Sequence, residues 1–171
     1  MKRHVVLLGL PGAGKSTVGR RAAKLLGTDF DDTDVLVVRR AGRSITDIFA
    51  EEGEPAFRRR ERAAMTTALG RPARVIAAGG GWAAEPGNLE AALGRALTIY
   101  LSCTPETAAR RTAGSAERPL LSSDHLAAMA ALLARRDPFY RRADAQVATD
   151  RRDAEAVVSD VVALARSHGG W

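Results

Sequence analysis

A glycine-rich run that ends in a lysine and a serine carries the strongest chemical signal in this sequence. Residues 9–16 read Gly-Leu-Pro-Gly-Ala-Gly-Lys-Ser and match G-x-x-x-x-G-K-[ST] at every fixed position. Glycines let the backbone curl so that N–H groups point at phosphate oxygens, while the lysine supplies a cation and the serine a hydroxyl for Mg²⁺. The pattern therefore predicts a site for a nucleoside triphosphate and Mg²⁺. The residues expected to form it are Gly12, Ala13, Gly14, Lys15, Ser16 and Thr17.

Two aspartates follow in the run Asp32-Thr33-Asp34, at the end of the next expected strand. Parallel sheets present ligand-binding groups at the carboxyl ends of their strands. Asp32 can hold Mg²⁺ directly or through water, together with Ser16, and Asp34 can orient an acceptor hydroxyl and take its proton. The structural alternative is that Asp34 caps the helix that follows. Because a P-loop precedes the pair, we favour the catalytic interpretation.

A third expected strand, 75–78, runs into Gly79, Gly80 and Gly81 and carries no acidic residue. Many P-loop enzymes place a metal-binding aspartate after a further strand, so Asp32 is the carboxylate available for that task here. A tight turn explains one or two glycines, whereas three favour close approach of a ligand to bare backbone that donates N–H groups. We therefore expect an acceptor molecule at this edge of the sheet.

Alternating strands and helices must position these groups. Apolar β-branched runs predict strands, and helix-favouring stretches between glycine and proline stops predict helices. This order predicts an α/β fold, the P-loop NTPase-type three-layer sandwich, with a five-stranded parallel sheet and helices on both faces. Thr46 is the expected N-cap of one helix, and Pro138 is expected to follow the end of another. Strands are expected at 5–9, around 29–30, 75–78, 97–101 and 145–148, and helices at 15–26, 35–41, 47–52, 55–69, 88–93, 105–112, 126–136 and 154–167.

Length and composition limit the class of protein. With 171 residues, 46% of them hydrophobic, the chain is long enough for a single domain over residues 1–171. Its apolar runs are too short to span a bilayer, and its first residues indicate a strand and not a secretory signal. Cys103 is its single cysteine, and we expect it to pack at a strand end. These features favour a cytoplasmic protein without disulfides and with no membrane partner.

The net charge of +6 permits nucleic-acid binding, but the arginines are scattered and the aromatic residues are few: four Phe, two Trp and two Tyr. No pattern of base-stacking side chains is evident. Positive potential also suits a cleft that binds ATP and a carboxylated small molecule, so we expect no nucleic-acid partner. No long exposed apolar helix face stands out, and we therefore expect a monomer.

Taken together, these motifs resemble those of the shikimate kinases. The resemblance extends from residue 4 to about residue 165, and the segment 42–61 with the triple glycine separates this family from adenylate-type and gluconate-type kinases. The matching pieces, in the order of the family, lie at 9–17, 32–34, 42–49, 53–61, 79–81, 118–121 and 136–140.

The resemblance implies an ATP-dependent kinase, with Mg²⁺, that phosphorylates the 3-hydroxyl of shikimate in aromatic amino-acid biosynthesis. It implies that Asp34 holds the reacting hydroxyl and that Arg58 and Arg136 bind the carboxylate through paired hydrogen bonds, with Glu61 one helical turn from Arg58 to fix it. The implied substrate-binding helices lie at about 34–62, and the residues 79–81 pack on the ring.

The resemblance also implies a mobile lid at about 114–124, in which Arg118 covers the phosphates and excludes water. The implied catalytic residues are therefore Asp34, Lys15 and Arg118. Arg111 and Arg152 are expected beside the adenine.

Trp82 departs from the family pattern, which has a small residue after the triple glycine. If the indole faces the core, the pocket is unchanged; if it faces the pocket, the acceptor becomes a different cyclitol. Two other functions therefore stay open: a kinase for a related polyol such as gluconate, and a non-catalytic P-loop nucleotide-binding protein. The second would need neither Asp34 nor Arg118.

Overall fold

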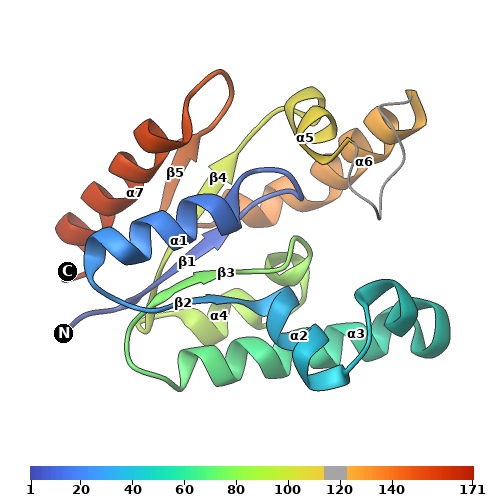
Figure 1. Cartoon of the computed structure of the whole chain (residues 1–171), viewed down its shortest axis with the longest axis horizontal. Helices are drawn as coiled ribbons and strands as arrows, with labels where there is room; N and C mark the ends of the chain where they lie inside the picture. The colour runs from blue at the N-terminus through green and yellow to red at the C-terminus, as the bar shows by residue number, and fades with distance from the viewer. Residues whose placement is uncertain (114–122) are drawn as a thin grey trace.

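The computed structural model describes residues 1–113 and 123–171 and centres on a five-stranded parallel sheet (Figure 1). The strand order is β2-β3-β1-β4-β5, and Val6 of the central strand is paired with Ile76 on one side and Thr98 on the other. The predicted sheet is confirmed, with small shifts at the strand ends. The strands are β1 (His4–Leu8), β2 (Phe30–Asp32), β3 (Val75–Ala77), β4 (Ala96–Ser102) and β5 (Ala145–Ala148).

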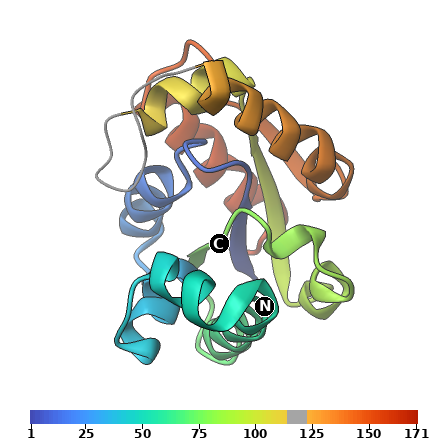
Figure 2. The same ribbon diagram turned by 90° about the vertical axis from the view of Figure 1, so that its right-hand side faces the viewer.

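Helices cover both faces of this sheet. The first and last helices pack against each other, and Figure 2 shows them on the opposite side of the sheet from α4 and α6. The order of layers is therefore helix, sheet, helix, as predicted. The helices are α1 (Lys15–Leu26), α2 (Thr33–Ala41), α3 (Ile45–Leu69), the short 3₁₀ turn η1 (Trp82–Ala84), α4 (Asn88–Ala92), α5 (Pro105–Thr112), α6 (Ser123–Tyr140) and α7 (Ala154–His168).

The core consists of the aliphatic residues of the inner strands and the helix faces that cover them. All residues of β1 and β3 are buried, which is typical of parallel strands covered on both faces. Trp82 belongs to this core and is 1% exposed, so its indole faces the interior and not the pocket. The Asn88 side-chain amide donates to the Trp82 carbonyl at 2.8 Å and holds η1 in place.

Two predicted helix ends are wrong for local reasons. Ser44, and not Thr46, caps α3, because the Ser44 Oγ accepts a hydrogen bond from the Asp47 N–H at 3.0 Å. Helix α6 does not end at residue 136 but continues through Pro138 to Tyr140. Proline removes one helical N–H, and here the helix tolerates the loss because Pro138 lies at an exposed position in its last turn.

Helix α3 contains the two helices predicted at 47–52 and 55–69, joined at a kink. Gly53 forms the kink with φ 78° and ψ 171°, a conformation that favours glycine, and Pro55 follows in the first turn of the second stretch. A small apolar cluster of Val37, Ile48, Phe57 and Ala64 joins α2 to both stretches of α3. The two helices thus form a packed unit beside the carboxyl edge of the sheet.

The two chain ends lie side by side (Figure 1). The Arg3 N–H donates to the Gly169 carbonyl at 2.9 Å, and the Trp171 indole N–H donates to the Arg3 carbonyl at 3.0 Å. In the described part of the chain, no helix combines the length and hydropathy needed to cross a membrane. Residues 114–122, which include Arg118 and most of the predicted lid, lie outside the described residues.

Candidate active site

The phosphate-binding loop leaves the end of β1 and leads into α1. Gly9, Gly12 and Gly14 have positive φ values of 145°, 84° and 97°. A Cβ on Gly9 would lie 2.5 Å from the Leu101 carbonyl oxygen, and one on Gly12 would lie 2.8 Å from the Ala108 carbonyl oxygen. The path of the loop therefore requires glycine for both conformation and space. The N-cap residue of α1 is Gly14, which has no side chain to cap the helix, so the N–H groups of the first turn suit an anion.

Lys15 lies inside this loop. Its Nζ donates to the carbonyl oxygens of Gly9 at 2.7 Å and Leu10 at 2.9 Å. Burial lowers the pKa of Lys15 from its ordinary 10.5 to about 8, although the negative charges of Asp34 and Asp32 oppose the shift. A triphosphate beside the amine would stabilise the charged form, so the site favours a strongly anionic ligand.

Asp32 joins the loop to α2. Its Oδ2 accepts a hydrogen bond from the Ser16 hydroxyl at 2.6 Å, and its Oδ1 accepts from the N–H groups of Asp34 at 3.0 Å and Val35 at 3.4 Å. The cap of α2 is therefore Asp32, and the alternative in which Asp34 caps this helix is wrong.

The same two side chains fit a magnesium ion. Ser16 and Asp32 offer oxygen atoms beside the phosphate loop, which is the donor type that Mg²⁺ prefers, and Mg²⁺ usually takes one or two carboxylates and completes its shell with phosphates and water. Within residues 1–113 and 123–171, no group of three or more His, Cys, Asp or Glu side chains gathers as an all-protein metal site would require.

Thr33, between the two aspartates, is fully buried, and the sequence does not single it out. Its Oγ1 accepts a hydrogen bond from the Gly79 N–H at 2.9 Å and donates to the Ala77 carbonyl at 3.4 Å. Thr33 therefore ties the start of α2 to the glycine loop, by which we mean residues 79–81. The Gly79 N–H is used inside the protein, so the N–H groups that the triple glycine is predicted to offer a ligand do not include this one.

The first glycine of this loop lies against two carboxylates. A Cβ on Gly79 would collide with Glu61 Oε1 and would lie 2.8 Å from Asp34 Oδ1. Glu61 is 1% exposed, and burial raises the pKa of its carboxyl group, with Asp34 adding to the increase and Arg58 opposing it. The absence of a side chain at Gly79 is thus what allows Glu61 and Asp34 to approach the loop.

The next two glycines each face one of the predicted carboxylate-binding arginines. A Cβ on Gly80 would lie 3.0 Å from Arg136 Nη1, and one on Gly81 would lie 2.5 Å from Arg58 Nη2. The glycine loop therefore brings together Asp34, Arg136 and Arg58 from three different helices. The sequence predicts close approach to bare backbone, and the structure shows that the approaching groups include the site's own side chains.

Carboxylates hold the Arg58 guanidinium in place. Arg58 Nη1 donates to Glu61 at 2.8 Å, Nη2 donates to Glu54 at 3.0 Å, and Nε lies 3.6 Å from Glu85. The predicted pair with Glu61 is confirmed. Glu54 is an additional partner that was not predicted, although its position four residues before Arg58, one helical turn away, could have indicated it. Because each terminal nitrogen uses one N–H in these contacts, the second N–H of each suits a ligand carboxylate.

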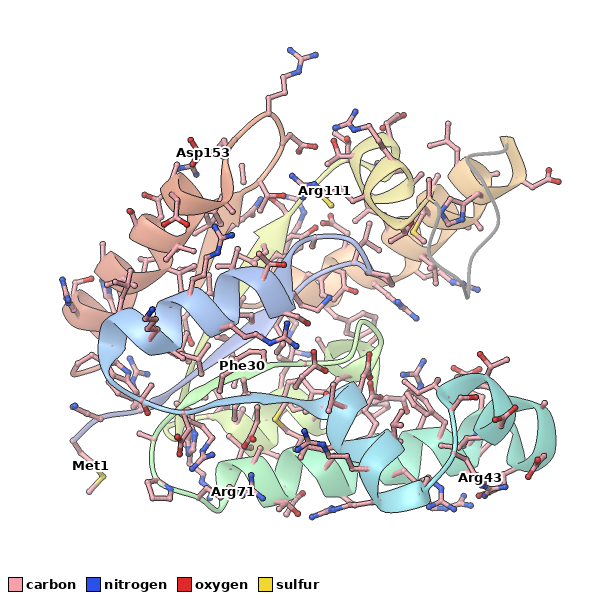
Figure 3. The ribbon with its side chains drawn as sticks, in the orientation of Figure 1. Met1, Phe30, Arg43, Arg71, Arg111 and Asp153 are labelled. Carbon is pink, nitrogen blue, oxygen red and sulfur yellow. The ribbon has the colours of Figure 1, made fainter. Side chains whose placement is uncertain are left out.

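Arg111 and Arg152 differ in their relation to the P-loop. Arg111 lies above the sheet beside the P-loop (Figure 3), where Nη1 donates to Thr149 Oγ1 at 3.0 Å and to the Gly12 carbonyl at 3.3 Å. Arg152 instead pairs with Asp160 of α7 at 2.8 Å. The structure therefore brings Arg111, but not Arg152, into contact with the P-loop. An adenine-binding role for either arginine stays a prediction.

One cavity of about 220 Å³ connects the P-loop with Asp32, Asp34 and Gly80, whereas Arg58 and Arg136 are not among its lining residues. The P-loop, both aspartates and the middle of the glycine loop therefore face a common space. Arg58 instead lines a separate groove of about 830 Å³ along α3, and the P-loop places the phosphate site in the smaller cavity. The lining residues are Pro11, Gly12, Gly14, Lys15, Ser16, Thr17, Asp32, Asp34, Ala77, Ala78 and Gly80.

A P-loop that shares a cavity with an aspartate and a glycine loop flanked by arginines defines a small-molecule kinase of the P-loop class. A model of the shikimate kinase family matches residues 11–166. A shikimate kinase of Mycobacterium tuberculosis (strain ATCC 25177 / H37Ra) is 46% identical over 164 residues, which are 95% of this chain and 93% of that protein. The chain belongs to the shikimate kinase family.

Solved structures agree with this assignment. The shikimate kinase from Acinetobacter baumannii in complex with shikimate is similar with a TM-score of 0.90 and 36% identity, covering 98% of this chain and 94% of that one. A gluconokinase from Sinorhizobium meliloti 1021 is similar with a TM-score of 0.64 and 20% identity, covering 99% and 94% of the two chains, which shows a shared fold alone.

Proposed function

We propose that this chain transfers the γ-phosphoryl group of ATP to the 3-hydroxyl of shikimate, with Mg²⁺. The observation that carries the proposal is the arrangement along the glycine loop, where Asp34, Arg136 and Arg58 lie against successive glycines. One proton acceptor and two guanidinium groups suit an acceptor molecule that carries both a hydroxyl and a carboxylate. The shikimate-bound relative from A. baumannii supports the same choice of acceptor.

Asp34 is the residue that acts on the acceptor hydroxyl. It lines the same cavity as the P-loop, so a hydroxyl bound to Asp34 lies on the side of the γ-phosphate. In the transfer, the hydroxyl oxygen forms a bond to the γ-phosphorus, the bond from that phosphorus to the β–γ bridging oxygen breaks, and ADP leaves. Asp34 orients the hydroxyl and accepts its proton as the new bond forms.

Arg58 and Arg136 fix the other end of the acceptor. Arg58 is held by Glu61 and Glu54, and it keeps N–H groups for a ligand carboxylate, so its orientation is set before binding. Pre-set donors lose little conformational freedom when the ligand arrives, which favours affinity and correct placement of the hydroxyl.

The nucleotide side of the reaction depends on the P-loop. Its N–H groups and Lys15 bind the phosphates, with the ammonium placed to neutralise charge that builds up on the transferred group. Ser16 and Asp32 would hold Mg²⁺, which supplies further neutralisation of the phosphate charge when bound. The predicted contributions of Arg118 over the phosphates, and of Arg111 and Arg152 beside adenine, are part of the same proposal.

Two rival functions make different predictions. A gluconate or cyclitol kinase would phosphorylate that compound and not shikimate; the buried indole of Trp82 removes the sequence-based reason to expect a different cyclitol. A non-catalytic nucleotide-binding protein would bind ATP with no response to shikimate. The monomeric state and the cytoplasmic location expected from the sequence stay predictions, and light scattering after size-exclusion chromatography tests the first.

The experiment that tests the proposal is a coupled ADP-release assay with shikimate, quinate, gluconate and inositol as acceptors. We expect shikimate-dependent turnover by the unmodified chain. Asp34→Asn should lower kcat by at least about 100-fold, because it removes the proton acceptor, while ATP affinity stays within about twofold. Absence of shikimate-dependent turnover would overturn the acceptor assignment, and full activity of Asp34→Asn would overturn the role of Asp34.

A further inference from the structure

Tyr140, the last residue of α6, connects two parts of the acceptor site. Its side chain is 1% exposed, and its hydroxyl donates a hydrogen bond to the Gly80 carbonyl oxygen. The Arg136 guanidinium, one helical turn earlier, lies close enough to the phenol for its positive charge to oppose the rise of the Tyr140 pKa. Arg136 also lies against Gly80, because a Cβ added at Gly80 would be 3.0 Å from Arg136 Nη1. The phenol therefore binds the same glycine of the loop against which an arginine assigned to the acceptor lies.

The ring of Tyr140 is anchored to the sheet. It packs on the ring of Tyr100 in β4, with centroids 5.0 Å apart and an interplanar angle of 34°. The Tyr100 hydroxyl donates to Asp137 Oδ1 at 3.0 Å, so the same stretch of α6 is attached to β4 a second time. Because β4 pairs with β1, which leads into the P-loop, Tyr140 links the acceptor site to the strand pair that carries the phosphate site.

The hydrogen bond to Gly80 also fixes a peptide orientation. A trans peptide is planar, and its C=O and N–H groups point in opposite directions. When Tyr140 holds the Gly80 carbonyl, the Gly81 N–H is directed away from the phenol. Burial raises the pKa of Tyr140 to about 12, so its hydroxyl stays protonated and remains a donor at any pH where the enzyme works.

We propose that Tyr140 is a positioning residue that fixes the glycine loop and Arg136 relative to each other and thereby sets the affinity for the carboxylated acceptor. The inference rests on the proposed function and adds a residue to it. A phenylalanine would fill the same space and keep the ring contact with Tyr100, so packing alone does not require the hydroxyl. The hydroxyl is required only if its hydrogen bond to Gly80 matters.

The test is Tyr140→Phe in the full chain, with steady-state kinetics for both substrates. We expect the KM for shikimate to rise about tenfold, because the half-buried Gly80 carbonyl loses its donor and the peptide against which Arg136 lies is no longer fixed. The KM for ATP and kcat should stay within about twofold. The matched control is Tyr100→Phe, which deletes a hydroxyl from the other member of the ring pair but leaves the Gly80 contact; its KM for shikimate should stay within about twofold.

A second acceptor shows whether the effect passes through carboxylate binding. With the shikimate analogue whose carboxylate is reduced to a primary alcohol, Tyr140→Phe and the unmodified chain should have KM values within about twofold. An unchanged KM for shikimate in Tyr140→Phe would overturn the inference, and so would equal increases in the KM values of shikimate and ATP, which indicate general loosening. If the unmodified chain has no shikimate-dependent turnover, the proposed function fails first and the inference falls with it.

Discussion

Replacing Gly81 by alanine should weaken acceptor binding and leave ATP binding intact. The backbone at Gly81 has φ −94° and ψ −7°, the conformation of the third residue of a type I turn, which is open to most L-residues. The added Cβ would lie 2.5 Å from Arg58 Nη2 and 2.6 Å from Arg58 Cζ. The substitution therefore acts on one guanidinium group and not on the fold of the loop.

The size of the effect follows from how Arg58 is held. To restore van der Waals contact, the guanidinium has to retreat by about 1 Å, against hydrogen bonds to Glu61 at 2.8 Å and Glu54 at 3.0 Å. A displaced guanidinium no longer aligns with the ligand carboxylate, and a hydrogen bond to a charged group contributes about 1.5–3 kcal/mol. We therefore expect the KM for shikimate to rise about 10- to 100-fold.

The assay is ADP release with shikimate varied at saturating ATP, and then with ATP varied at saturating shikimate. The control is Gly70→Ala at the end of α3, where φ is −79° and the nearest atom to the new Cβ is the Thr66 carbonyl oxygen at 3.4 Å. This variant should have the KM values of the unmodified chain. A folded Gly81→Ala protein whose KM for shikimate stays within about twofold would refute the reasoning about Arg58.

Two further predictions concern charge and stability. Because burial lowers the pKa of Lys15 to about 8, its ammonium is lost above that pH in the nucleotide-free protein, and ATP affinity measured by calorimetry should fall about tenfold per pH unit above about 8. Lys15→Met should bind weakly at all pH values, and a flat profile for the unmodified chain from about pH 7 to 9.5 contradicts the assignment. Trp171→Ala removes the indole hydrogen bond to the Arg3 carbonyl. It also removes the aromatic ring whose centroid lies 4.7 Å from the Lys2 ammonium. The loss of both contacts should lower the free energy of unfolding by about 1–2 kcal/mol. Thermal denaturation should then show a midpoint lower by roughly 2–8 °C with kcat unchanged, and an unchanged midpoint counts against this role of the C-terminal residue.

The parts of this molecule that could be predicted from sequence are those fixed by local patterns. The phosphate loop is one contiguous motif in which the glycines, Lys15 and Ser16 each have a requirement that neighbouring residues reveal. The three inner strands β1, β3 and β4 are the mostly apolar runs that a covered parallel sheet requires. The pair of Arg58 and Glu61 follows from helical spacing, and the structure confirms it. These signals need no knowledge of tertiary contacts.

Tertiary contacts decide what the sequence leaves open. Trp82 could face the core or the pocket, and its neighbours in space, not in sequence, place it in the core. Ser44 and Thr46 are both good caps, and the backbone selects Ser44, which is extended with φ −68° and ψ 158°, whereas Thr46 lies inside the helix. Thr33 binds a backbone atom of the glycine loop 46 residues away in sequence, and Tyr140 binds one 60 residues away. Contacts over such separations cannot be predicted from local residue spacing.

The measurement that tests the central claim most directly is the identity of the product. The chain is incubated with ATP, Mg²⁺ and shikimate, and the product is examined by phosphorus and proton NMR. We predict a phosphomonoester whose phosphorus couples to the proton on carbon 3 of shikimate, formed in equal amount to ADP. A phosphoryl group on a different hydroxyl, or ADP formed without any phosphorylated shikimate, would contradict the assignment of Asp34, Arg58 and Arg136 to this acceptor.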